Sequence, residues 1–266
     1  MKVSQSAYYA SLNRLPSKRK QEDDVLKAEI QLIHKQSRKT YGKRRIQAEL
    51  RANGKNHGLF RIGRLMREAD LKAKATKKFK VTTESNHGLV VYTNELNRNF
   101  SPEKPHTHFV SDITYIRTLT GWLYLAVTID LFSRKVAGWS MANHMRAELV
   151  CDAFLMAKTR CPEGADGMHH SDRGVQYCSE AFQALLNAYG ITSSMSRKGN
   201  CWDNACAESF FHSLKVECVG DRIYANQEEA KQDIFDYIEI FYNRQRRHSF
   251  LGYTSPQEFE NMALAA

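Results

Sequence analysis

The sequence predicts an α/β protein in which a five-stranded mixed sheet with flanking helices follows a small all-α domain. Apolar residues recur at helical spacing before residue 70, whereas strand-like segments rich in β-branched and aromatic residues begin near residue 106. Charge changes at the same place, because residues 1–105 carry 24 Lys and Arg against 10 Asp and Glu, and residues 106–266 carry 15 against 19. This asymmetry favours a polyanion-binding module joined to a separate core, with a basic surface kept for solubility as the alternative.

Composition excludes several classes of protein. The chain has 266 residues, of which 42% are hydrophobic, so it can form one large or two modest folded domains. No apolar segment approaches the roughly 18 to 20 residues of a membrane helix, and the first residues contain no apolar signal core. We therefore expect a cytoplasmic protein without a membrane partner. The six cysteines lack paired C-x-x-C spacing, which argues against a zinc site or a disulfide framework and for reduced thiols.

The basic front of the chain predicts a DNA-binding unit. Residues 1–20 are expected to form a loose lead-in, and residues 21–75 a helix-turn-helix-like domain with helices over 24–38, 43–53 and 60–69. Contact with phosphates is expected rather than base reading, since nothing in the pattern selects a base. A three-helix bundle with solvated arginines is the alternative. The candidate DNA contacts here are Lys43, Arg44, Arg45, Arg61, Arg64 and Arg67.

The remaining segments predict a linker, a core and a tail. Residues 76–104 are polar and lack a sustained period, which indicates a basic linker, and residues 105–220 form the core. Strands are predicted over 109–117, 122–130, 135–141, 167–170 and 191–196, and helices over 146–160, 179–189 and 201–217. Three strands followed by helix, strand, helix, strand and helix is the order of the RNase H-like fold.

Residues 221–266 are expected to complete the core with a helix over 234–242 and a basic, aromatic tail. Arg244, Arg246 and Arg247 alternate there with Tyr and Phe, a combination that can grip and stack on DNA. A helix packed on the core, with a solvated basic turn, explains the same pattern equally well.

Three acidic residues lie on three different predicted elements. Asp112 lies inside the first strand, Asp172 follows the fourth strand, and Glu208 borders the apolar face of the helix over 201–217. A single Glu at such a border is usually an ordinary surface residue. If the fold brings the three carboxylates together, however, they could bind divalent cations through oxygen ligands.

Two phrases around these acids carry a family resemblance. His170-Ser171-Asp172-Arg173-Gly174 and Asp203-Asn204-Ala205 through Glu208-Ser209-Phe210-Phe211, with 35 residues between Asp172 and Glu208, resemble the DDE catalytic core of bacterial insertion-sequence transposases. That core is similar to the retroviral integrase core. The chain is most similar to the second-frame product (OrfB) of elements with two overlapping frames, over nearly its whole length. Phe109 stands where the family more often has Trp, and it can fill the same apolar role.

The resemblance implies an activity, cofactors and partners. Asp112, Asp172 and Glu208 would bind two Mg²⁺ or Mn²⁺ ions for DNA strand cleavage and strand transfer at the ends of an insertion sequence. Lys215 would approach a phosphate beside the metals. The implied partners are the terminal repeats, the target DNA, further copies of the chain and a first-frame (OrfA) protein as fusion or partner, at the nucleoid.

Other residues and other functions are also consistent with parts of the pattern. Asp130 is expected to end a strand, Asp203 or Asn204 to cap the helix over 201–217, and His170 to pack in the core. A DNA-binding regulator with an inactive core is a second hypothesis, against which the presence of all three acids argues. A related enzyme, such as a phage-type integrase or a nuclease, is a third, and the basic helical front argues against a plain nuclease.

Overall fold

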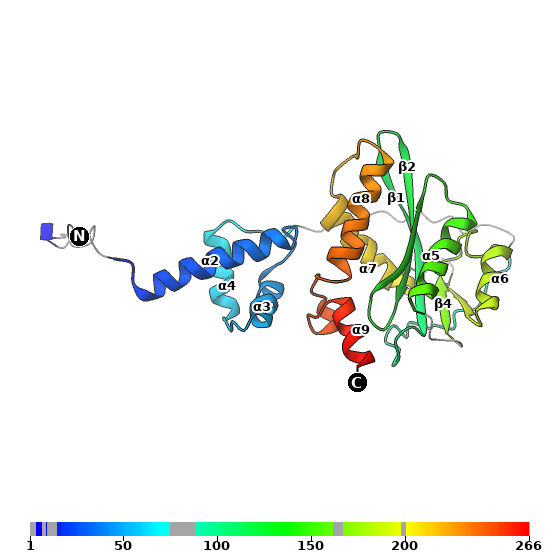
Figure 1. The fold of residues 1–266 in the computed structure, drawn as a ribbon, viewed down its shortest axis with the longest axis horizontal. Coiled ribbons are helices and arrows are strands. Elements are labelled where there is room, and N and C mark those ends of the chain that lie inside the picture. Colours follow the sequence, from blue (N-terminus) through cyan, green and yellow to red (C-terminus); the bar gives the residue numbers. More distant parts are fainter. Residues whose placement is uncertain are drawn as a thin grey trace. The chain divides into compact units, whose positions relative to one another are not determined.

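A computed structural model gives the fold of residues 4–6, 9, 15–74, 89–161, 167–197 and 201–265. Half of the predicted lead-in, and the linker residues 75–88, lie outside this part of the chain. The chain divides into two compact units, Met1–Lys74 and Ala75–Ala266 (Figure 1).

The first unit consists of three packed helices. They are α2 (Lys18–Gln36), α3 (Lys43–Ala52) and α4 (Leu59–Glu68). Their shared core is formed by fully buried aliphatic side chains, namely Ile30, Ile46, Leu50, Ile62 and Leu65. The predicted start of the first helix was wrong. The side chain of Ser17 accepts from the Lys20 backbone N–H at 3.3 Å, so α2 starts at Lys18, in a charged first turn that the apolar pattern could not reveal.

The second unit contains the predicted five-stranded mixed sheet, in the order β3-β2-β1-β4-β5. The strands are β1 (His108–Thr118), β2 (Gly121–Asp130), β3 (Val136–Ala142), β4 (Met168–Ser171) and β5 (Thr192–Met195). The first three pair antiparallel, whereas β4 and β5 run parallel to β1.

Helices cover both faces of this sheet. In Figure 1, α5 (Ala147–Arg160) and α6 (Glu180–Ala188) lie on one face, and α7 (Ala205–Leu214) and α8 (Gln227–Phe235) lie on the other. This double covering explains the continuous apolar sequence of β2, which is buried from Leu125 to its end. On the α5 side, the rings of Phe154, Tyr177 and Phe182 pack edge to face.

The C-terminal region differs from the prediction. The helix expected over 234–242 begins earlier, as α8, and continues as a π-helical segment, Asp236–Tyr242. A further helix, α9 (Pro256–Leu264), was not predicted. Its signal is present in the sequence, since Ser255 and Glu258 form a capping box and Pro256 occupies the first turn.

Residues 89–104 are not a free linker. Leu96 is buried, and the hydroxyl of Ser194 on β5 accepts from the backbone N–H groups of Glu95 and Leu96 at 3.0 and 3.1 Å. The Met195 N–H also donates to the Thr93 carbonyl at 3.2 Å. This segment therefore belongs to the second unit, although its polar composition resembles that of a linker.

A buried polar cluster attaches α9 to the sheet. Glu260 accepts from Lys135 Nζ at 2.6 Å and contacts His106 Nε2 at 2.9 Å, with Cys161 beside them. His106, Cys161 and Glu260 could hold a metal ion by distance alone, but the Lys135 ammonium already supplies the cation that Glu260 requires. Hydrogen bonds to Cys161 and then Glu260 raise the pKa of His106 from 6.5 to about 10.

This raised pKa predicts a pH-dependent stability. Protonated His106 stabilises the fold fully below pH 6.5, and the contribution is lost as the pH rises through about 10. His106→Asn, which suits the left-handed backbone at this position, should lower the free energy of unfolding by about 1.5–3 kcal/mol at pH 6. The difference from wild type should shrink above pH 9.

Urea unfolding followed by tryptophan fluorescence measures this effect in the second unit alone, because all three tryptophans lie there. His57→Asn, in the helical unit, is the control and should leave the curve unchanged. A difference between His106→Asn and wild type that stays constant from pH 6 to 10 would contradict the proposed linkage.

Candidate active site

The pairing of β1 with β4 brings Asp112 and Asp172 together. His108 pairs with Met168 and Val110 with His170 in parallel register, a constant offset of 60 residues. Two residues beyond Val110 and His170, the same offset places Asp112 on β1 opposite Asp172, which directly follows β4. Pairing stops at Val110, so the two carboxylates lie where the strands part.

The loop after β4 fixes the Asp172 carboxylate. Its Oδ1 accepts from the Gly174 backbone N–H at 2.9 Å. A Cβ at position 174 would lie 3.0 Å from that same oxygen and 3.1 Å from Gln176 Oε1. A side chain at position 174 would therefore require these two oxygens to shift by a few tenths of an ångström.

Glu208 approaches the site from α7, which packs against β1. Its helix buries Ala207, Phe210, Phe211 and Leu214, and Glu208 lies at the exposed border of that face, as predicted. Asn204 occupies the N-cap position of α7 as one of the two predicted caps, but its side chain makes no cap hydrogen bond. A 3₁₀ turn (Cys201–Asn204) precedes α7, and the Asn204 amide instead donates to the Ser111 carbonyl at 3.1 Å. This bond ties the Glu208 helix to the residue before Asp112.

Electrostatics indicate that the three acids share one environment. Burial raises the pKa of Asp112 well above its usual range, the charge of Asp172 raises it further, and Glu208 adds a smaller effect. The ammonium of Lys215 opposes these effects. Burial also raises the pKa of Glu208. Three carboxylates beside one ammonium leave an excess of negative charge and several oxygen donors, a set that fits hard divalent cations.

Lys215, the first residue after α7, lies close enough to Asp112 for its charge to act on that carboxyl. Its Nζ lies 5.7 Å from the centre of the Tyr115 ring on β1. The Tyr115 ring in turn packs edge to face on Trp122 at 5.1 Å, and both aromatics are partly exposed. The Lys215 ammonium thus lies near both the acids and the exposed Tyr115–Trp122 pair.

Asp203 does not cap a helix but holds three segments together. It is fully buried and accepts from the Arg197 backbone N–H and guanidinium, from Arg98 Nε at 2.9 Å and from Asn94 Nδ2 at 2.9 Å. The Arg197 side chain hydrogen bond is the largest of the effects that lower the pKa of Asp203. Sequence reasoning missed both arginines, whose side chains are 44% and 51% exposed beside the Glu208 helix.

The structural roles expected for Asp130 and His170 are confirmed. Asp130 ends β2, is fully buried, and accepts from the backbone N–H groups of His106 and Ser133 at 3.1 and 2.9 Å. His170 is buried on β4, and its ring nitrogens contact the hydroxyls of Ser194 and Ser196 at 2.8 and 3.1 Å.

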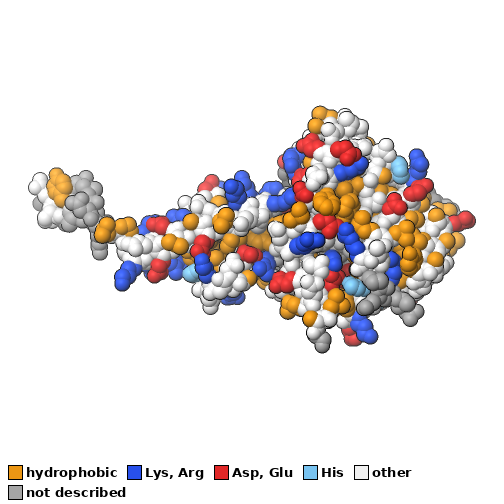
Figure 2. Space-filling view, in the orientation of Figure 1, with side chains coloured by type: hydrophobic (Ala, Val, Ile, Leu, Met, Phe, Trp, Pro, Cys, Tyr) orange, Lys and Arg blue, Asp and Glu red, His pale blue; other side chains and the backbone are white. Residues whose placement is uncertain are grey.

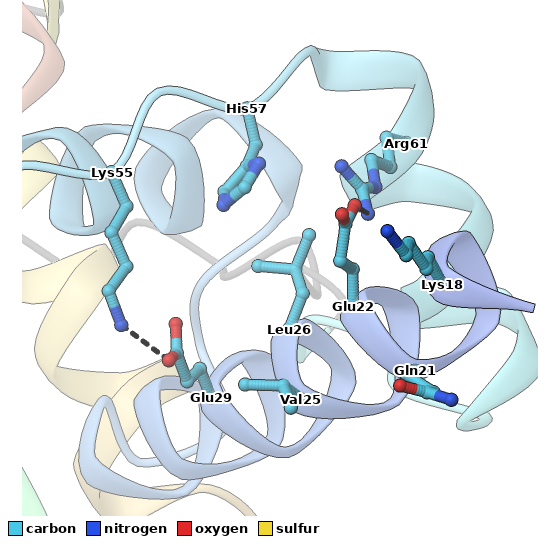
Figure 3. Close-up of a pocket in the computed structure, with 9 residues that line it drawn as sticks. All are labelled: Lys18, Gln21, Glu22, Val25, Leu26, Glu29, Lys55, His57 and Arg61. Atoms are coloured by element: carbon cyan, nitrogen blue, oxygen red, sulfur yellow. Dashed lines mark hydrogen bonds and ion pairs between the residues drawn. The ribbon is translucent and has the colours of Figure 1, made fainter.

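The basic residues predicted to contact DNA in the helical unit fall into two groups. Asp23 is buried and pairs with Arg61 at 2.7 Å and with Arg64 at 2.5 Å, and Arg61 also turns toward Glu22 (Figure 3). These two guanidinium groups therefore stabilise the packing of α2 on α4. The residues on the exposed side are Lys43, Arg44 and Arg67, whereas Arg45 is half-buried over the Tyr41 ring.

The surface of the helical unit has an open pocket and a mixture of basic and acidic side chains. An open pocket of about 630 Å³ lies along α2, lined by Lys18, Gln21, Glu22, Val25, Leu26, Glu29, Lys55, His57 and Arg61 (Figure 3). On the face seen in Figure 2, Lys and Arg side chains alternate with acidic ones instead of forming one patch. On this face the basic side chains are thus not gathered in one patch.

The three tail arginines also differ from one another. Arg244 is exposed. Arg246 is only 5% exposed, and its guanidinium donates to both carboxylate oxygens of Glu217 at 2.8 Å. The predicted DNA contact of Arg246 was therefore wrong, because the residue forms a buried ion pair. Arg247 is half-buried and donates to the Tyr253 carbonyl at 3.3 Å.

Comparisons with known proteins agree with this architecture. Models of an integrase core domain match residues 102–201 and 208–264, and a model of an HTH-like domain matches residues 20–79. The chain is 46% identical to the insertion element IS600 uncharacterized 31 kDa protein of Shigella sonnei, covering 97% of this chain and 94% of that protein. It is 43% identical to transposase InsF for insertion sequence IS3A of Escherichia coli (strain K12), covering 100% and 93%.

The fold also resembles a solved viral assembly. In the cryoEM structure of a simian T-cell lymphotropic virus intasome in complex with PP2A regulatory subunit B56 gamma, one chain aligns with a TM-score of 0.50 at 14% identity. The alignment covers 80% of this chain and 70% of that one, and it supports the fold. Among the described residues, every helix is too short or too polar to cross a bilayer.

The buried Arg246–Glu217 pair predicts a large loss of stability on truncation. Arg246→Ala would leave the Glu217 carboxylate buried without its cation and should cost about 3–5 kcal/mol in the free energy of unfolding. Arg244→Ala, two residues earlier and exposed, should change it by no more than about 0.5 kcal/mol. Urea unfolding of both variants measures the contrast. If Arg246→Ala unfolded like wild type while losing DNA affinity, the DNA-contact interpretation of Arg246 would be restored.

Proposed function

The chain belongs to the insertion-sequence transposases that carry an integrase catalytic core, and we propose that Asp112, Asp172 and Glu208 are its catalytic residues. The family acts in transposition and DNA integration, by polynucleotidyl transfer. One observation carries the assignment: acids from a strand, a loop and a helix share an environment in which burial and mutual repulsion raise the pKa of Asp112. Such perturbed carboxylates are typical of functional sites.

The cofactor proposed for this site is a pair of Mg²⁺ or Mn²⁺ ions. The three carboxylates supply the oxygen ligands that such cations prefer, and their mutual repulsion favours a cation among them. Two ions bound there would activate the attacking oxygen and stabilise the leaving 3′ oxygen of an in-line displacement. Water as the attacking group gives cleavage, and a DNA 3′-OH gives strand transfer.

The protein's own groups then have separable tasks. The Gly174 N–H fixes one oxygen of Asp172, and the Asn204 amide holds the Glu208 helix against β1. Lys215 would bind a DNA phosphate beside the acids, because its ammonium already lies in their electrostatic environment. Exposed Lys43, Arg44 and Arg67 would bind phosphates along the DNA.

The partners follow from the reaction. Transposition pairs two DNA ends, so we propose a homo-oligomer that binds the terminal repeats and the target at the nucleoid. A first-frame (OrfA) protein, fused or separate, would help to recognise the repeats. Arg244 would add a phosphate contact from the tail, with Arg247 as a weaker candidate because it is half-buried.

Removing any of the three acids should abolish the chemistry while DNA binding survives. Asp112→Asn, Asp172→Asn and Glu208→Gln should each lower cleavage and strand transfer by at least about 10³-fold, since metal-ion catalysis contributes several kcal/mol. The assay uses a labelled element-end duplex with Mg²⁺ or Mn²⁺. Glu228→Gln, on the exposed side of α8, is the matched control and should retain activity.

Each outcome of this assay has a definite meaning. Full activity of Glu208→Gln would exclude Glu208 as a ligand. If wild type and variants were all inactive although they bound DNA, the chain would act as a regulator or would require its first-frame fusion. The two cases separate when the fused protein is assayed.

The exposed cations of α3 should contribute to DNA affinity without selecting its sequence. Replacing Lys43 and Arg44 by Gln should reduce the slope of log K against log salt concentration by about 0.9 for each phosphate that the variant no longer neutralises. Lys231→Gln, on α8, is the control and should leave the slope unchanged. Binding titrations between low and physiological salt give this slope. An unchanged slope in the double variant would remove α3 from the DNA-binding surface.

A further inference from the structure

The hydroxyl of Tyr177 is a buried polar group without a hydrogen-bond partner among the described residues. Tyr177 is 1% exposed, in the core between the sheet and α5 and α6. Buried polar atoms are almost always paired, and an unpaired one lowers stability, so each exception calls for an explanation.

Packing does not explain this hydroxyl. The Tyr177 ring packs edge to face on Phe182 at 5.5 Å, and a phenylalanine ring would make the same contact. The backbone of Tyr177 is held independently, because its N–H donates to the Gly174 carbonyl at 3.0 Å and its own carbonyl accepts from Gln183 at 2.7 Å. The oxygen is thus dispensable for the fold.

The position of Tyr177 supplies a reason for the hydroxyl. The Tyr177 ring and the Asp172 carboxylate both lie beside Gly174, since a Cβ there would be 3.7 Å from Tyr177 Cδ2 and 3.0 Å from Asp172 Oδ1. Burial, and then the charges of Asp112 and Asp172, raise the pKa of the Tyr177 hydroxyl well above its usual range. The hydroxyl therefore keeps its proton, and the charges of both carboxylates reach it.

We propose that Tyr177 is a positioning residue of the metal site, whose hydroxyl donates a hydrogen bond to a carboxylate oxygen of the Asp112–Asp172 pair when a divalent cation is bound. This inference rests on the proposed function. Backbone N–H groups already hold one oxygen of each acid, from Ile113 at 2.8 Å and from Gly174 at 2.9 Å. An ionised carboxylate has about four lone-pair positions, so it can bind a cation and still accept further hydrogen bonds.

The role is that of an outer-shell partner, which orients a ligating carboxylate without contacting the metal. In the absence of the cation the hydroxyl lowers stability, and in its presence the hydroxyl gains an acceptor. Removing the oxygen should therefore leave the metal-free protein as stable or more stable, but should weaken the metal-bound protein. A purely structural tyrosine would show a loss of stability alone.

Tyr177→Phe tests this prediction in the full-length chain. Without metal, the variant should unfold at the same temperature as wild type or at a higher one. Its dissociation constant for Mn²⁺, measured by electron paramagnetic resonance, should rise by about tenfold. Cleavage should fall at limiting Mn²⁺ and recover as the metal concentration increases. Tyr189→Phe is the matched control, because that ring likewise packs edge to face on a buried phenylalanine, Phe154, but is 41% exposed, and both measurements should stay at wild-type values.

The possible results separate this inference from the proposed function. If wild type binds Mn²⁺ and Tyr177→Phe binds it equally well, the positioning role is overturned and the three acids keep their assignment. A lower unfolding temperature without metal would overturn the premise that the hydroxyl is unpaired. If wild type binds no Mn²⁺, or Glu208→Gln binds it as tightly as wild type, the proposed metal site itself fails.

Discussion

The short parallel pairing of β1 with β4 is the constraint on which the proposed catalytic site depends. A slip by one residue would turn Asp112 and Asp172 to opposite faces of the sheet, because side chains alternate along a strand. A buried polar chain opposes such a slip: the Ser111 hydroxyl contacts His169 Nε2 on β4 at 2.7 Å and the Thr128 hydroxyl on β2 at 2.9 Å. Burial lowers the pKa of His169 to about 3, so this chain stays uncharged and fixes the register at the residue before Asp112.

Bringing the acids together costs free energy, and the surrounding contacts resist the repulsion. Asn204 ties the start of α7 to β1, and Asp203, its neighbour, holds the end of β5 through Arg197 and the upstream segment through Arg98. Both residues are buried, which makes their hydrogen bonds stronger and harder to replace by water. The carboxylates can thus remain close before a cation arrives, as a preorganised site requires.

The sequence revealed elements better than contacts. Apolar patterns identified every strand of the sheet and the helix that carries Glu208, because an element with one buried face alternates regularly and a strand buried on both faces is apolar throughout. They could not identify the partners of a buried charge. Asp203 has the residue type and position of a helix cap, yet its partner Asn94 lies 109 residues earlier, where no local pattern refers to it. Arg246 likewise resembled a surface cation until its pairing with Glu217 was known. Where a signal was purely local, as in the capping box of α9, it was present and could have been used.

The proposed metal site also explains how the mildly acidic half of the chain, residues 106–266, can act on DNA, which is itself negatively charged. Residues 106–266 carry 15 Lys and Arg against 19 Asp and Glu, and three of these acids are the carboxylates proposed to bind metal. A cation bound among them would remove their repulsion of DNA. Nonspecific affinity can then come from the basic front of the chain, whose excess charge is 24 Lys and Arg against 10 Asp and Glu over residues 1–105. The charge difference between the two halves thus matches their proposed roles, in which residues 1–105 bind DNA and residues 106–266 cleave it.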